Sequence, residues 1–137
     1  MRRIEKGSWH GIVLCLAVLL ADSVSAASES ERLVDTAKKA YESTAAAFDC
    51  GISGDPERLH LWSCRWLDAE LGVSDSQTKS ASAYSAHLER MKALSKKVSV
   101  KEQTGAMGVA PEHVDAVAYY LAEAEEWLKE GKQKAHH

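Results

Sequence analysis

The chain has 137 residues, with 17 basic and 20 acidic side chains and a formal net charge of −3. A chain of this length forms one domain with one modest core. Charges of both signs are mixed along it without a basic stripe, which excludes nucleic acid as an expected partner. Alanine, glutamate, lysine and leucine are abundant and only two prolines occur, a composition that favours helices.

The first segment, 1–26, has the three-part layout of a secretory signal. A basic start precedes an apolar run over 12–21, and small residues come just before the expected cut after Ala26. The run is about half the roughly 20 apolar residues that a membrane span needs, so we expect a cleaved leader and no span after cleavage. We therefore predict an exported protein, periplasmic or extracellular, with a mature domain over 27–137. Cleavage removes three basic and two acidic side chains, which leaves a net charge of about −4.

A first helical hairpin is predicted over about 30–73. Its first helix, about 30–50, carries apolar and small side chains at alternating steps of three and four, the seam of a coiled coil. Gly51 ends this helix, and the Asp-Pro-Glu segment 55–57 is typical of a helix start. The seam residues of the two helices are Val34, Ala37, Tyr41, Thr44, Phe48, Leu59, Trp62, Trp66, Ala69 and Val73.

A second hairpin is predicted over about 76–132. One helix covers about 76–104, a Gly-Ala-Met-Gly loop follows at 105–108, and the last helix begins near Pro111. The seam residues of these helices are Tyr84, His87, Met91, Leu94, Val98, Val114, Val117, Leu121, Ala124 and Leu128.

The two hairpins match each other, which indicates an internal repeat. The loop over 51–59 aligns with 105–114 when one inserted residue is allowed. Beyond the loops, Leu59, Trp62, Trp66 and Glu70 align with Val114, Val117, Leu121 and Glu125. One hairpin cannot bury its own seam, but two can bury each other's. We therefore predict an all-α antiparallel four-helix bundle built from two duplicated helical hairpins.

The first hairpin carries the pattern Ala37, Tyr41, Phe48, Gly51, Leu59, Trp62, Trp66, Leu67, Glu70 and Leu71. This pattern resembles the helical hairpin repeats of TolC-like outer-membrane efflux proteins. The segment 119–128 is also similar to the last helix of small exported bacterial helical proteins. The resemblance implies a helical relative without the channel, because the sequence has no alternating strand segments. It implies no catalytic or ligand residue.

Three tryptophans are the candidates for partner binding: Trp62, Trp66 and Trp127. They either fill the core or form an exposed aromatic surface that anchors a partner helix.

Two cysteines remain after cleavage, Cys50 and Cys64, and export permits a disulfide between them. Cys64 is several residues further from the hairpin turn than Cys50, so the bridge would have to span an offset of up to about 10 Å. The alternative is two small, half-buried residues without a bridge.

The sequence predicts no catalytic residue, no metal site and no cofactor. Glu57 and His60 have a spacing used in di-iron bundles, but the second such motif is missing. His60 lies one turn before Cys64, yet nothing supplies an oxyanion site. His87 is expected to be a core or boundary histidine.

We expect a non-enzymatic structural or interaction module whose partner is a helical protein or a second copy of the chain, in association with the cell envelope. The alternative is a bundle that binds a small ligand, a metal or haem.

Overall fold

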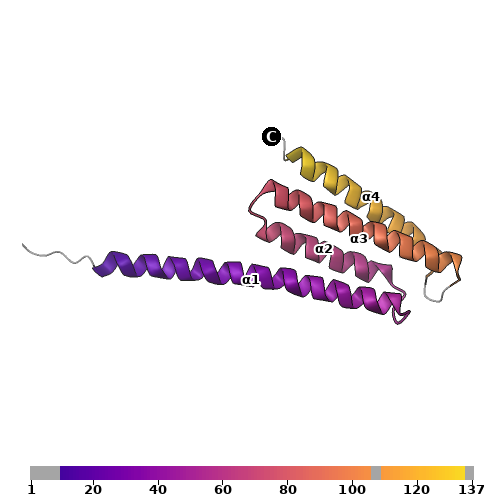
Figure 1. Ribbon diagram of the computed structural model, residues 1–137, viewed down its shortest axis with the longest axis horizontal. Helices are drawn as coiled ribbons and strands as arrows, with labels where there is room; N and C mark the ends of the chain where they lie inside the picture. The colour runs from indigo at the N-terminus through magenta and orange to yellow at the C-terminus, as the bar shows by residue number, and fades with distance from the viewer. Residues whose placement is uncertain (1–9, 106–108, 135–137) are drawn as a thin grey trace, which may run out of the picture.

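The computed structural model of the protein describes residues 10–105 and 109–134, with side chains described over 29–105 and 109–133. Its helices are α1 (His10–Asp49), α2 (Pro56–Val73), α3 (Gln77–Gln103) and α4 (Pro111–Lys134). Successive helices run in opposite directions (Figure 1). The described ranges contain no strand. The predicted all-α antiparallel bundle of four helices is therefore confirmed.

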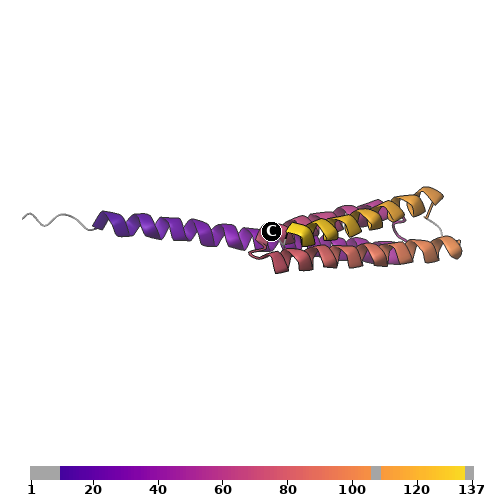
Figure 2. The same ribbon diagram turned by 90° about the horizontal axis from the view of Figure 1, so that it is seen from above.

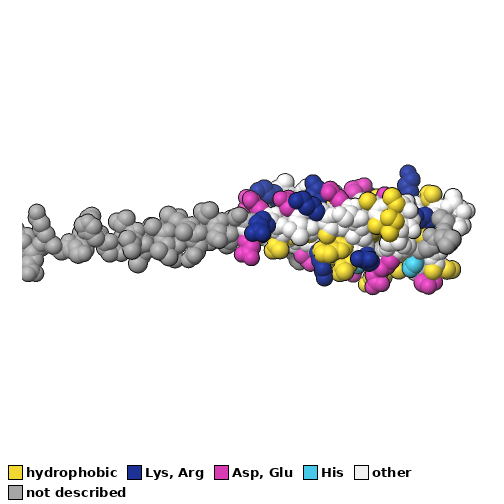
Figure 3. All heavy atoms as spheres, turned by 90° about the horizontal axis from the view of Figure 1, so that it is seen from below, with side chains coloured by type: hydrophobic (Ala, Val, Ile, Leu, Met, Phe, Trp, Pro, Cys, Tyr) yellow, Lys and Arg dark blue, Asp and Glu magenta, His cyan; other side chains and the backbone are white. Residues whose placement is uncertain are grey.

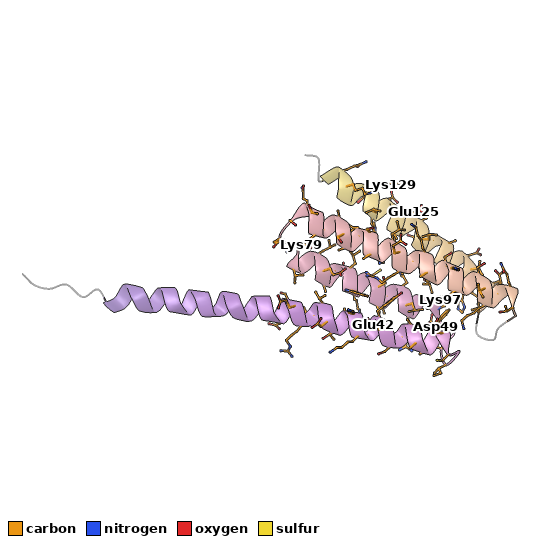
Figure 4. All side chains as sticks on the ribbon, viewed as in Figure 1. Glu42, Asp49, Lys79, Lys97, Glu125 and Lys129 are labelled. Carbon is orange, nitrogen blue, oxygen red and sulfur yellow. The ribbon has the colours of Figure 1, made fainter. Side chains whose placement is uncertain are left out.

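The centre of the bundle is the pair of α2 and α3. The helix α2 packs against α1, α3 and α4, whereas α1 and α4 are not neighbours in the described ranges. The two outer helices lie on opposite sides of the central pair, as the two ribbon views show (Figures 1 and 2). Side chains connect α1 with α3: Lys97 Nζ lies 2.7 Å from Asp49 Oδ2, near the end of the bundle where α1 stops (Figure 4).

Side-chain caps fix two helix starts where the sequence predicts them. Asp55 Oδ1 accepts a hydrogen bond of 2.9 Å from the backbone N–H of Glu57, and Pro56 occupies the first turn of α2. At the start of α3, Ser76 Oγ accepts a bond of 3.3 Å from the backbone N–H of Lys79. Each cap satisfies an N–H group that the helix itself leaves without an acceptor.

Glycines end two of the helices. Gly51 has a φ of +73°, and the N–H of Ile52 donates to the Ala47 carbonyl at 2.9 Å. This is the left-handed helix end that glycine adopts without the steric penalty of a Cβ. Gly105 has a φ of +63° just after α3. Both glycines were predicted to lie in the two hairpin loops.

The core is formed where the four seams meet. Its buried members are Phe48, Leu59, Leu88, Met91, Leu94, Val98, Val117 and Ala124. On α2 the fully buried line passes through Leu59, Ser63 and Leu67, whereas Trp62 and Trp66 of the predicted seam are only half-buried. The difference has a physical reason: α2 contacts three helices, so the side facing α3 and α4 is buried most deeply.

The helix α1 is longer than predicted. The sequence predicts a start near Ser30, whereas the helix of the full sequence begins at His10. The apolar run over 12–21 consists of residues compatible with helix, and no proline separates it from the bundle. The first half of α1 extends beyond the other helices (Figure 1). In the described part, no helix has both the length and the apolarity needed to cross a membrane.

Candidate functional site

An apolar groove runs along the outer junction of α1 and α2. It has a volume of about 400 Å³, and its walls carry Leu33, Thr36, Ala37, Trp62, Arg65, Asp68 and Ala69. Leu33 is 59% exposed at its edge. The Arg65 guanidinium carbon lies 4.7 Å from the centre of the Trp62 ring, a cation–π contact that covers one face of the indole. Figure 3 shows one face of the bundle, on which hydrophobic side chains form patches between charges of both signs.

The three predicted tryptophans do not form one surface. Trp62 is half-buried in the wall of the groove. Trp66 lies further inside, with its ring centre 5.8 Å from that of Tyr41 and 4.1 Å from the guanidinium carbon of Arg90. Trp127 stacks on His87 at a ring separation of 5.4 Å. Trp62 alone of the three lines the groove, so it is the one placed to meet a partner.

A buried polar network joins α2 to α3. Ser63 is fully buried, and its Oγ lies 2.8 Å from His87 Nδ1. Arg90 Nε donates to the same Ser63 Oγ at 2.8 Å. Since an arginine can only donate, the hydroxyl oxygen of Ser63 accepts from Arg90. The tautomer of His87 decides whether Nδ1 accepts the hydroxyl proton or donates to the second lone pair of the oxygen. The other ring nitrogen, Nε2, is buried and has no hydrogen-bond partner in the described structure.

Burial controls the charges of this network. Burial, followed by the nearby charge of Arg90 and by His60, lowers the pKa of His87 to about 4. His87 is therefore neutral at neutral pH. Burial also lowers the pKa of Arg90, while the Glu70 carboxylate opposes this shift. The guanidinium lies over the ring of Trp66, which supplies further stabilisation of its charge.

Only His87 of this network was expected from the sequence, as a core or boundary histidine, and the structure places it in the core. Ser63 and Arg90 were missed because the predicted α2 seam ran through Trp62 and Trp66 instead. One signal in the sequence could have indicated this contact. Ser63 is the only hydroxyl residue between Trp62 and Trp66 on α2. A small buried side chain leaves room for a long one from the facing helix.

A second polar group lies between α2 and α4. Cys64 Sγ is 3.3 Å from His60 Nε2, and Glu123 Oε2 is 3.4 Å from the same nitrogen. The His60 ring stacks on Tyr120 at 3.8 Å. Burial lowers the pKa of His60, against the opposing effect of Glu123. Burial, followed by the charges of Glu123 and Asp68, raises the pKa of Cys64 to about 11.

This geometry does not activate the thiol. In a nucleophilic triad the base contacts the nucleophile with one nitrogen and the carboxylate with the other. Here both groups approach Nε2 of His60, and the negative charge of Glu123 disfavours a thiolate. Within the ranges whose side chains are described, no group of three His, Cys, Asp or Glu residues is placed to hold a metal ion.

Cys50 and Cys64 are both free thiols, so the disulfide considered above is not formed. Cys50 is exposed just after α1, whereas Cys64 lies half-buried on α2 against His60. Cys64 is two turns past the start of α2, which gives it the offset from the turn that the sequence indicates.

No protein-family model, curated protein or solved structure matches the chain.

Proposed function

We propose that the chain is an exported, non-enzymatic interaction module that binds another helix in the groove between α1 and α2. The observation that carries this proposal is the groove itself. It is apolar along its length and edged by the exposed Leu33, and Trp62 is held in its wall by Arg65. An apolar groove between two helices is the receiving half of a helix-in-groove contact, and a tryptophan is a frequent anchor in such interfaces.

The layout of the first 26 residues supports export to the periplasm or beyond it. Glu31 and Val34 of α1 line a hollow together with Val73 at the end of α2. Packing between the two helices therefore begins a few residues after Ala26, and a cut there leaves the packed part of α1 within the mature domain. A role at the cell envelope and the resemblance to TolC-like hairpins belong to this same proposal.

The proposal excludes catalysis by Cys64 on chemical grounds. A thiol whose pKa is about 11 is protonated at neutral pH. Its neighbour His60 is neutral and has its Nε2 between a thiol and a carboxylate. Because the thiol stays protonated and the thiol and the carboxylate approach the same imidazole nitrogen, the group contains no activated nucleophile.

Site-specific photo-crosslinking tests the proposal in cells that make the full chain. A photoreactive phenylalanine at Leu33 lies at the groove, and the same group at Lys129, exposed on α4, is the control. We expect the groove position alone to yield a crosslinked protein. In a separate measurement on the purified chain, we expect a mass that corresponds to a start at Ala27. Equal labelling from both positions, or none from Leu33, contradicts the binding role.

A further inference from the structure

The outward face of α2 carries a line of exposed residues that no other helix of the chain covers. We call it the outer stripe; it consists of Arg58, Leu61, Arg65, Asp68 and Gly72, all exposed. Their separations of three, four, three and four residues place them in one line along the helix, as in the seam of a coiled coil. This line points away from the buried residues Leu59, Ser63 and Leu67. It lies between α1 and α4, which are not neighbours in the part of the chain that the structure describes.

The outer stripe is complementary to itself when read in reverse. If two copies of α2 pack antiparallel about a two-fold axis between positions 66 and 67, Arg65 faces Asp68 of the second copy, and Asp68 faces Arg65. The same axis places Leu61 against Gly72 of the second copy. In a parallel arrangement, like charges would face each other at both positions, and such contacts are unfavourable. The charges therefore select the antiparallel orientation.

The shape of the surface agrees with this register. Leu61 is 46% exposed and projects as a knob. A methyl group built on Gly72 would meet no atom within 4 Å, so the position opposite that knob is open. Ala69, one turn before Gly72 on α2, lines the apolar groove together with Leu33 of α1. The Leu61 side chain of the second copy would thus cover the end of the groove that contains Ala69.

From this complementarity we infer that the chain forms an antiparallel homodimer through the outer stripe of α2, with Leu61 of each copy in the groove of the other. Such an interface is isologous, since the same patch acts on both sides. This inference deepens the proposed function and rests on it, because it names a second copy as the helical partner of the groove.

The test is sedimentation equilibrium of the protein purified from cells that express the complete sequence, over a wide range of concentration. In a dimer of Arg65→Asp, the new aspartate of each copy faces Asp68 of the other copy. In a dimer of Asp68→Arg, the new arginine of each copy faces Arg65 of the other copy. We expect each substitution alone to raise the dimer dissociation constant about tenfold or more. An equimolar mixture of the two variants should form a heterodimer, because every facing pair is then of opposite charge.

Two substitutions on α4 serve as matched controls, since they change the net charge by the same amounts. They are Lys129→Asp and Glu125→Lys, at two exposed residues of α4 (Figure 4), whereas the outer stripe belongs to α2. We expect both controls to dimerise as the unaltered chain does. Circular dichroism of every variant verifies that the helix content is unchanged, so that a monomeric variant is not simply an unfolded one.

Three outcomes would overturn the inference. The unaltered chain could remain monomeric at all concentrations, the single variants could dimerise as well as their controls, or the mixture could fail to recover the dimer. A monomeric chain that is still crosslinked from Leu33 to a different protein would refute the homodimer and leave the proposed function standing. A dimer without any crosslink from Leu33 would refute the groove as the contact.

Discussion

Ser63 is the residue on which the contact between α2 and α3 depends. Its hydroxyl accepts a hydrogen bond from Arg90 and shares another with His87 Nδ1, so one small side chain contacts two much larger ones. A buried charge without a partner is costly, and this network gives the guanidinium both a hydrogen bond and an aromatic face. The network is therefore one of the contacts that orient α2 toward α3.

Cys64 is expected to be a slow thiol. With a pKa of about 11, it is thiolate in roughly one molecule per thousand at pH 8. Iodoacetamide should therefore modify Cys64 about tenfold or more slowly than the exposed Cys50, measured by mass spectrometry on Cys50→Ser and Cys64→Ser variants. Glu123→Gln should accelerate the reaction of Cys64, because it removes a negative charge that raises its pKa. Equal rates for the two thiols would show that the burial described for Cys64 is wrong.

For single residues, the sequence predicted which side chains are buried better than it predicted which side chains contact each other. The heptad pattern identified Phe48, Met91 and Leu94 as core residues because apolar periodicity reports burial directly. It could not reveal that Ser63 receives Arg90, since this contact depends on how far α2 is rotated about its own axis. That rotation is set by the contacts of α2 with three helices, and these are not visible in the periodicity of one segment.

At the scale of helices and loops, local signals determine where each element ends. The cap at Asp55, the start of α3 near Ser76 and the glycines at 51 and 105 were all readable from the sequence, because each signal acts within a few residues. The start of α1 was not, because no local signal near Ser30 interrupts the helix. In the structure α1 is continuous from His10.

Two glycines are expected to respond to alanine with opposite signs. Gly51 has a positive φ, so Gly51→Ala should reduce the free energy of unfolding by about 1 kcal/mol. Gly72 lies in the last turn of α2 with open space around it, so Gly72→Ala should increase the free energy of unfolding by up to about 0.5 kcal/mol. Urea unfolding at low protein concentration measures both. A loss of stability in both variants would contradict the helical conformation of Gly72.

For the whole molecule, the neutral His87 makes stability depend on pH. Its pKa of about 4 in the folded state is below the ordinary value of 6.5, so the unfolded chain binds a proton that the folded chain does not. This contribution is fully present above pH 6.5 and is lost as the pH falls toward 4, by about 3 kcal/mol in total. The lowered pKa of His60 acts in the same direction.

Urea unfolding at a series of pH values between 7 and 4 measures this loss. The variant His87→Gln should be less stable at pH 7, because the core histidine is removed, but its stability should change less over this interval. The unaltered chain, measured over the same series, is the reference. If His87→Gln loses stability as steeply as the unaltered chain does, His87 is not the group that titrates.

The alternating direction of the helices also gives the molecule two unlike poles. The end of α4 and the overhanging half of α1 lie at one pole, while the ends of α1 and α3 lie at the other (Figure 1). An attachment to a surface or to a fused reporter through the start of α1 or the end of α4 would occupy the first pole. The second pole, with Ile52 82% exposed at its tip, would then project outward. The side of α2 would stay accessible between them, so tethering and lateral pairing are geometrically independent.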